Sequence, residues 1–213
     1  MRMAKLYTPF ILAMCAVVAA SNYLVQFPVQ ATLGGINLAD LLTWGAFTYP
    51  VAFLVTDLTN RRFGPAAARI IVAFGFVLAV ALSIWLATPR IAIASGSAFL
   101  VAQLLDVSVF ERLRRSAWWK APLISSVLGS VIDTVLFFGV AFSAGFAVLD
   151  TGFGLEDGSL AFPVPFLGVG GDVPLWVSLG AGDFVVKILV ALVLLAPYRV
   201  LRGFIADRSA VAA

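Results

Sequence analysis

The stretch Val173–Val200, VPLWVSLGAGDFVVKILVALVLLAPYRV, is almost wholly apolar yet carries Asp183 and Lys187 near its middle. A transmembrane helix needs about 20 mostly apolar residues, so this stretch is long enough to cross a bilayer. A charged side chain at the centre of such a helix costs about 2.5–3.5 kcal/mol on insertion scales. Asp183 and Lys187 stand at i and i+4, which places the acid and the base on one helix face. The stretch therefore predicts a membrane helix whose charged face lies against protein or a water-filled cavity.

Five further stretches of this 213-residue chain are long and apolar enough to cross a bilayer. They run over Pro9–Ala31, Leu38–Leu58, Ala66–Thr88, Ile91–Leu113 and Ala121–Gly145. Hydrophobic residues make up 62% of the chain and charged residues 12%, against about 25% charged in soluble domains. We therefore expect a single integral membrane domain over residues 1–213, an all-α protein of six transmembrane helices.

The basic residues gather in alternate connections between the expected helices. One group comprises Arg2, Lys5, Arg61, Arg62, Arg69, Arg112, Arg114, Arg115, Lys120, Arg199, Arg202 and Arg208, and Arg90 alone falls on the opposite side. Cytoplasmic loops are enriched in Lys and Arg, so we expect a multi-pass protein of the inner (plasma) membrane with both termini cytoplasmic. The Gly- and Pro-rich loop Phe146–Asp172 is then external. Alternatively, the first stretch is a cleavable signal peptide ending at Val18-Ala19-Ala20, although its apolar run continues beyond that point.

Polar side chains recur at helical spacing in other stretches. Ser126 and Asp133 lie on one face of the fifth expected helix. With a rise of about 1.5 Å per residue, Asp133 and Asp183 fall near the middle of the membrane, and Asp106 lies deeper toward the cytoplasm. If these charges faced lipid, each would cost about 3 kcal/mol, a large part of the stability of a fold. We expect one mid-membrane substrate site formed by Asp133, Asp183, Lys187, Gln103, Asp106, Ser126, Asn22 and Trp176.

Each of these patterns also has a purely structural interpretation. Serines on a helix face allow close packing of helices. Gln103 and Asp106 are suited to a hydrogen-bonded pair across helices, and Asp183 with Lys187 to a self-neutralising pair that permits insertion. The sequence alone leaves these alternatives open.

A further charged pair, Asp57 and Arg61, lies one turn apart at the cytoplasmic end of the second stretch. Gly64 and Pro65 follow, and these residues suit the end of one helix and the first turn of the next. We expect a junction that either gates the transport path or forms a solvated salt bridge of little energetic consequence.

The composition excludes several classes of chemistry. The chain has no histidine and one cysteine, Cys15, so the commonest metal ligand and any Cys-rich site are missing. We expect no metal and no cofactor. We also expect no nucleic-acid partner, because the net charge is only +3 and the basic residues are distributed among alternate loops rather than gathered in one patch. Mid-membrane polar groups suit a transporter that replaces water around a small-molecule substrate. We therefore expect a transporter surrounded by membrane lipids rather than an enzyme.

An intramembrane protease is the main alternative from another class. Gly180-Ala181-Gly182-Asp183 matches the Gly-x-Gly-Asp signature of intramembrane aspartyl proteases, with Asp133 as a candidate second carboxylate. Lys187, one turn from the supposed catalytic acid, argues against this reading because it would hold that acid ionised. An assembly subunit without transport activity is the third class, but it would not need so many central charges.

Three segments resemble the queuosine precursor transporters, also called the vitamin uptake transporter family. They are FTYPVAFLVTDLTNRRFG over Phe47–Gly64, AFLVAQLLDVSVFERLRR over Ala98–Arg115 and LISSVLGSVIDTVLFFGVAF over Leu123–Phe142. The Asp and Lys of the sixth stretch fit as well. Two features depart from the family: Arg61 stands where many members carry an acidic residue, and the outer loop is long.

The resemblance implies a six-helix inner-membrane importer of 7-deazaguanines such as 7-cyano-7-deazaguanine. It also implies a fold similar to the substrate-binding components of energy-coupling-factor importers. An energy-coupling module or a second copy of the chain is then a candidate partner. Independently of the resemblance, buried carboxylates suit proton coupling, and the sequence leaves open proton-coupled, facilitated and ATP-driven transport. Another small vitamin-like heterocycle is the alternative substrate.

Overall fold

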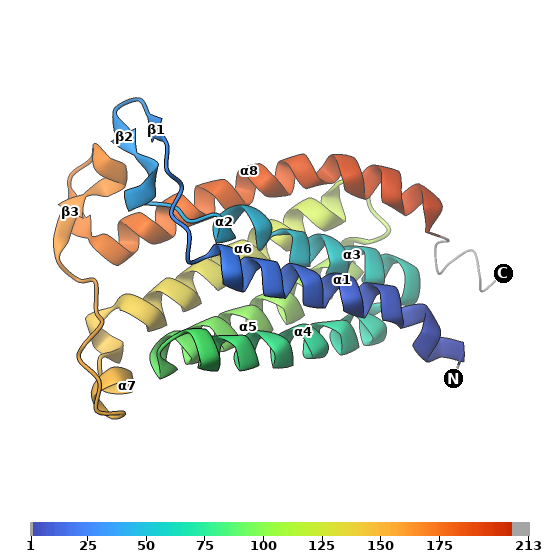
Figure 1. Ribbon diagram of the computed structural model, residues 1–213. Coiled ribbons are helices and arrows are strands. Elements are labelled where there is room, and N and C mark those ends of the chain that lie inside the picture. Colours follow the sequence, from blue (N-terminus) through green and yellow to red (C-terminus); the bar gives the residue numbers. More distant parts are fainter. Residues whose placement is uncertain (1, 206–213) are drawn as a thin grey trace.

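The computed structural model describes residues 2–205, with side chains from Leu6 onward. Its long helices lie side by side, with the start of α1 (Arg2–Leu24) and the end of α8 (Leu175–Phe204) at the same end of the bundle (Figure 1). The other long helices are α4 (Pro65–Leu86), α5 (Pro89–Leu113) and α6 (Lys120–Phe142). Within the described residues, these five helices are long and apolar enough to cross a membrane. The bounds of α4, α5 and α6 lie within one turn of those predicted, and α8 runs about one turn further.

The second expected helix is interrupted. Its first part holds only the 3₁₀ turn η1 (Leu38–Asp40), and helical structure starts with α2 (Gly45–Thr48) and continues as α3 (Val51–Phe63). Tyr49 and Pro50 keep right-handed helical dihedral angles between α2 and α3, so the two form one rod. The proline interrupts it because its ring nitrogen cannot donate a hydrogen bond. The prediction of six continuous spanning helices is therefore not confirmed: five long helices and one interrupted rod are described.

The first expected helix is shifted along the sequence. It begins earlier than predicted and ends at Leu24 rather than Ala31. Pro28 explains the early end, because the residue before a proline is disfavoured in a helix. Beyond it the chain turns back in a hairpin of β1 (Thr32–Leu33) and β2 (Ile36–Asn37). The apolar residues that resembled helix sequence instead form a cap over the end of the bundle away from the termini (Figure 1).

The connection between α3 and α4 has the structure that the sequence predicts. Gly64 adopts φ 87° and donates its N–H to the carbonyl of Asn60, which ends α3. Pro65 then starts α4, where a missing N–H carries no penalty. This turn places Asp57 and Arg61 at the end of the bundle that carries the termini.

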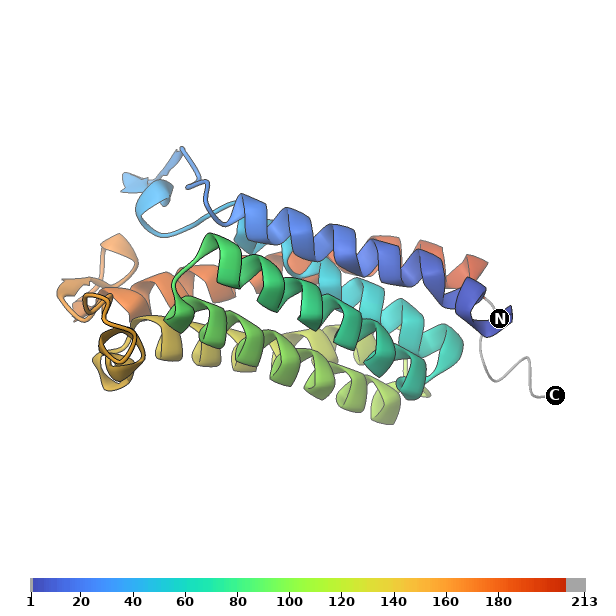
Figure 2. The same cartoon turned by 60° about the horizontal axis from the view of Figure 1, so that its bottom comes forward.

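Close helix packing depends on small residues. Figure 2 shows α1, α4 and α5 side by side along one face, in agreement with their contacts. α3 packs against both α5 and α6. At Gly129 of α6, an added Cβ would lie 2.7 Å from the Phe53 ring of α3, so only glycine permits this approach. The buried core around Ile71, Val72 and Val107 completes the packing.

The outer loop is ordered and joined to the helix ends by Arg90. It contains η2 (Ala144–Phe146), α7 (Val148–Thr151) and a second hairpin of β3 (Pro163–Pro165) and β4 (Asp172–Pro174). The η3 turn (Phe166–Gly168) follows β3. Arg90, 1% exposed, starts α5 and pairs with Asp150 at 2.7 Å.

Candidate functional site

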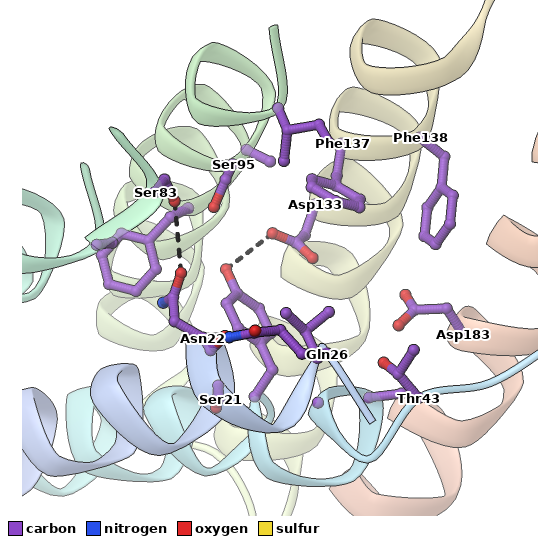
Figure 3. A pocket seen from close by; sticks show the side chains of 18 of the residues that line it. Ser21, Asn22, Gln26, Thr43, Ser83, Ser95, Asp133, Phe137, Phe138 and Asp183 are labelled. Carbon is purple, nitrogen blue, oxygen red and sulfur yellow. Dashed lines mark hydrogen bonds between the residues drawn. The ribbon is translucent and has the colours of Figure 1, made fainter. Parts of the chain in front are cut away.

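A cavity of about 420 Å³ opens between the helices in the half of the bundle away from the termini. Ligand sites in proteins commonly have volumes of about 300–1,000 Å³. It extends from the capping segment around Leu42 and Thr43 to a floor at Ala52 and Lys187. Figure 3 shows its polar groups converging from several helices. Its polar lining consists of Ser21, Asn22, Gln26, Thr43, Tyr49, Ser83, Ser95, Asp133, Asp183 and Lys187.

The floor holds a charged triad of Asp133, Lys187 and Asp183. The Nζ of Lys187 on α8 lies 2.6 Å from Oδ2 of Asp133 on α6 and 2.5 Å from Oδ2 of Asp183 one turn away. Thr134 Oγ1 donates to Asp183 Oδ2 at 3.1 Å. Tyr49 donates its hydroxyl to Asp133 Oδ1 at 2.8 Å. One ammonium thus contacts two carboxyl groups at the floor of the cavity.

The two carboxylates of the triad differ in what they can still bind. Both oxygens of Asp133 accept a hydrogen bond, one from Tyr49 and one from Lys187. The contacts of Asp183 described here both fall on Oδ2, and 14% of its side chain remains exposed. Asp183 lines the cavity (Figure 3). It is therefore the carboxylate of the triad with spare capacity for a ligand donor.

Aromatic side chains form the apolar wall. Phe137, Phe138 and Phe142 line the cavity from α6, and Phe99 lines it from α5. The Phe137 and Phe138 rings pack edge to face at 5.1 Å between centroids. Such a wall offers ring faces and edges to a flat ligand.

Uncharged polar groups line the part of the cavity nearer the cap. Asn22 Nδ2 donates to the carbonyl of Val18 at 2.9 Å, while its Oδ1 accepts from Ser83 at 3.4 Å. Ser21 donates to Thr48 at 3.0 Å. The predicted residue Asn22 thus faces the cavity, together with serines that helical spacing alone did not single out.

The structure brings four of the eight predicted site residues together in the cavity: Asp133, Asp183, Lys187 and Asn22. The other four, Gln103, Asp106, Ser126 and Trp176, are not among its lining residues. Gln103 accepts at Oε1 from Thr56 at 2.6 Å, and Ser126 borders a separate small crevice beside Asp57. Helical spacing placed Ser126 and Asp133 on one face, but it carried no information on which neighbouring helix each part of that face meets.

Asp57, Asp106 and Arg61 form part of a second polar region between the cavity and the end that carries the termini. Asp57 and Asp106 are 1% and 0% exposed, and their carboxyl groups lie within interaction distance of each other. Arg61 donates to the Tyr198 hydroxyl at 3.2 Å and to the carbonyl of Arg114 at 2.8 Å. Arg61 is 9% exposed, so the junction is not the solvated salt bridge that was one of the two expectations from the sequence.

Tyr49 is a cavity residue that the sequence pattern did not indicate. It stands beside Pro50 in an apolar stretch, and neither spacing nor charge marks it. Its role follows from the interrupted rod, which turns its hydroxyl toward Asp133 and its ring toward Lys187, whose Nζ lies 5.1 Å from the ring centroid. A tyrosine next to a proline inside an expected membrane helix was the available signal.

Comparisons with known proteins identify the family. The family model described as "Putative vitamin uptake transporter" matches residues 43–88 and 82–201. The chain is 36% identical over 208 residues to the "Probable queuosine precursor transporter" of Haemophilus influenzae, covering 85% of this chain and 79% of that one. It is 42% identical over 147 residues to the "Queuosine precursor transporter" of Escherichia coli, covering 59% of this chain and 64% of the relative.

A more distant relative is the "Probable queuosine precursor transporter" of Bacillus subtilis, 28% identical over 156 residues, covering 60% of this chain and 63% of the relative. No solved structure matches the chain, so the expected likeness to substrate-binding components of energy-coupling-factor importers stays a prediction. The family match extends over most of the chain and includes the residues of α6 and α8 that carry the triad. The chain therefore belongs to the vitamin uptake transporter family, a family of multi-pass membrane transporters rather than enzymes.

Proposed function

We propose that this chain imports 7-deazaguanine precursors of queuosine, such as 7-cyano-7-deazaguanine, and binds them in the cavity above the charged triad. The printed names of the relatives support the substrate class. The observation that carries the site is the partly exposed carboxylate of Asp183, held by Lys187 beneath an aromatic wall. A flat heterocycle with hydrogen-bond donors on one edge matches this arrangement.

The recognition follows from the chemistry of the base. A 7-deazaguanine presents N1–H and its 2-amino group as neighbouring donors, and a carboxylate accepts both in a strong bidentate pair. In our proposal Asp183 is that carboxylate. Asp133 is less available, because each of its two oxygens already accepts a hydrogen bond from the protein. The amide of Asn22 is placed to meet the opposite, acceptor edge of the ring. The rings of Phe137 and Phe138 pack against the faces and edges of the base.

The direction of transport is inferred from the charge distribution. The segments that carry the basic clusters lie at the end of the bundle that carries the termini (Figure 1). The cavity is lined by residues nearer the other end. If the basic end is cytoplasmic, as such clusters favour, the cavity faces outward. This arrangement suits capture of a base from outside the inner membrane.

The geometry of the triad does not favour the protease alternative. Two aspartates that activate water share a proton between facing carboxyl groups. Here the ammonium of Lys187 contacts both Asp133 and Asp183. The ammonium stands between the two acids, so they do not share a proton directly as the aspartates of such a protease do.

The test is uptake of tritiated 7-cyano-7-deazaguanine by cells that lack their own synthesis of queuosine precursors. Asp183→Asn removes the charge that would accept two donors, and charged hydrogen bonds contribute about 1.5–3 kcal/mol, so uptake should fall about tenfold or more. Asp172→Asn, at an exposed position of β4, is the matched control and should leave uptake unchanged. Uptake that Asp183→Asn does not affect would overturn the proposed site. Transport of a different heterocycle in place of the deazaguanine would overturn the substrate.

A further inference from the structure

Buried polar atoms without partners lie between the cavity floor and the end of the bundle that carries the termini. Within the described residues, Gln103 Nε2, Ser130 Oγ, both carboxyl oxygens of Asp106 and Asn60 Oδ1 are buried with no hydrogen-bond partner. A buried polar atom without a partner is costly, so native proteins normally supply one, often a water or a proton. Several such atoms in one region can be partnered by water molecules or by a proton.

These atoms follow one another along the helices. Ser130 lies one turn before Asp133 on α6, which places it below the triad. Gln103 lies one turn before Asp106 on α5 and accepts a hydrogen bond from Thr56 of α3. Asn60 lies nearly one turn beyond Asp57 on α3, and its amide donates to the carbonyl of Val107 at 2.9 Å. The unpartnered atoms therefore fall at successive turns of α3, α5 and α6, three helices that contact one another, and we call this set the buried file.

Asp57 and Asp106 stand at the centre of this file. Two neighbouring carboxyl groups buried in a protein repel each other when both are ionised, so such a pair is suited to hold one proton. Asp57 accepts from Ser125 Oγ at 3.4 Å, and the same serine lies near Asp106, but neither oxygen of Asp106 has a hydrogen bond of normal geometry. A proton on Asp106 would give that carboxyl group a hydrogen bond to Asp57. It would thereby supply the partner that its oxygens lack.

The surroundings of the pair leave room for a proton to enter and leave. The ionisable groups facing Asp57 are Arg61 on its own helix and Tyr198 on α8, while α6 presents only the hydroxyl of Ser125. A crevice of about 10 Å³ is bordered by Asp57, Ser126 and Tyr198, and Asp106 is not among its lining residues. That volume is close to what one water molecule requires. Asp57 is thus within reach of water on the side toward the basic end.

We propose that the Asp57–Asp106 pair is a proton-binding site that couples transport to the proton gradient. A proton passes from the cavity along the buried file, binds the carboxylate of Asp106, and leaves through Asp57 and the crevice toward the basic end. One proton is taken up and one released per cycle, and no other bond forms or breaks. This inference rests on the proposed function for the identity of the substrate, but the proton site itself can be tested without substrate.

The first test is infrared spectroscopy of the full-length purified protein. A buried protonated carboxyl group gives a carbonyl-stretching band that ionised carboxylates lack. We expect this band at neutral pH in the unsubstituted protein, its loss in Asp106→Asn, and its retention in the control Asp172→Asn. Absence of the band from the unsubstituted protein, or its retention in Asp106→Asn, would overturn the proton site whatever the substrate.

The second test separates coupling from transport in proteoliposomes. Exchange of labelled for unlabelled 7-cyano-7-deazaguanine needs binding and movement but no gradient, whereas accumulation against a gradient needs coupling. Asp106→Asn mimics the protonated state, so exchange should persist while accumulation driven by a pH gradient falls to the level without a gradient. If the unsubstituted protein exchanges the substrate but a pH gradient drives no accumulation, or a sodium gradient alone drives it, the coupling proposal fails and the transport proposal stands. Absence of exchange would remove the proposed substrate, and the infrared result would still decide the proton site.

Discussion

The ammonium of Lys187 on α8 lies 2.6 Å from a carboxylate oxygen of Asp133 on α6, and both side chains are almost fully buried. The two residues are distant in the sequence, and their contact joins two helices of the bundle below the cavity. Ion pairs removed from water depend on good geometry, because desolvation of each charge opposes the attraction between them. Here the hydroxyl of Tyr49 donates to Asp133 and that of Thr134 donates to Asp183, while Asp183 keeps capacity for a further donor.

We predict that Lys187→Met strongly destabilises the protein. It leaves Asp133 and Asp183 as neighbouring buried carboxylates without a cation, and breaking a buried pair costs about 3–5 kcal/mol. The loss should appear as a lower midpoint of thermal unfolding in detergent. The double variant Lys187→Met with Asp133→Asn removes one of the uncompensated charges and should recover part of the lost thermal stability. Lys120→Met, at an exposed position, is the control. Equal midpoints for the single variant and the control would contradict the importance of the triad.

We predict that Gly129→Ala disturbs the contact between α6 and α3. The added Cβ would lie 2.7 Å from the Phe53 ring, so the ring must shift. Overpacking of this kind costs about 1–3 kcal/mol. Gly139→Ala on the same helix is the matched control, because nothing lies within 4 Å of its added Cβ. Thermal unfolding of both variants measures the difference, and equal midpoints would rule out the close approach.

We predict that Arg90→Gln releases the outer loop from the helix ends. Arg90 pairs with Asp150 and donates to Ser159 Oγ at 3.1 Å, to the carbonyl of Val140 at 2.8 Å and to that of Ser143. Without it, the buried carboxylate of Asp150 loses its cation, at a cost of about 3–5 kcal/mol.

The measurement is limited proteolysis of the loop in membranes, with cleavage expected between Ser143 and Ser159. Arg90→Lys should restore only part of the protection, since an ammonium lacks the planar set of donors. Arg69→Gln, an exposed position on α4, should remain as resistant as the unsubstituted protein. Protection that survives Arg90→Gln would show that other contacts hold the loop.

We predict that strong acid loosens the segment around Asp157. The Ser159 hydroxyl and backbone N–H donate to its carboxylate at 2.6 and 2.9 Å, and these bonds lower the pKa of Asp157 below its usual value of 3.8, with a smaller contribution from Arg90. A lowered folded-state pKa stabilises the loop at pH values above the unfolded-state pKa. That stabilisation is lost as the pH falls through the folded-state pKa.

At neutral pH the Ser159 amide should therefore exchange its hydrogen more slowly than an unbonded amide at the same pH. The extra protection should disappear only below about pH 4, near the unperturbed pKa of an aspartate. In the Asp157→Asn variant, protection of the Ser159 amide should not change across this pH range. A transition that persists in Asp157→Asn would assign it to another carboxyl group.

The amino-acid sequence by itself determined the membrane character, the positions of α4, α5, α6 and α8, and the helix faces that carry Asp133, Asp183 and Lys187. These properties are local. Whether a stretch enters the membrane depends on its own apolar content, and helix periodicity fixes which side chains share a face. The resemblance of three segments to one family likewise needed only residue order, and the family match confirmed it.

Only the tertiary structure decided how the polar groups are divided. It separated Asp106 from Asp133, placed Asp106 beside Asp57, and turned Tyr49 into the cavity. It also converted the apolar run before Gly45 from an expected helix into a cap. The reason is that a helical pattern defines a face but not the neighbour it meets. That neighbour depends on where prolines break the rods and where glycines let helices approach, and both effects act between residues far apart in the chain.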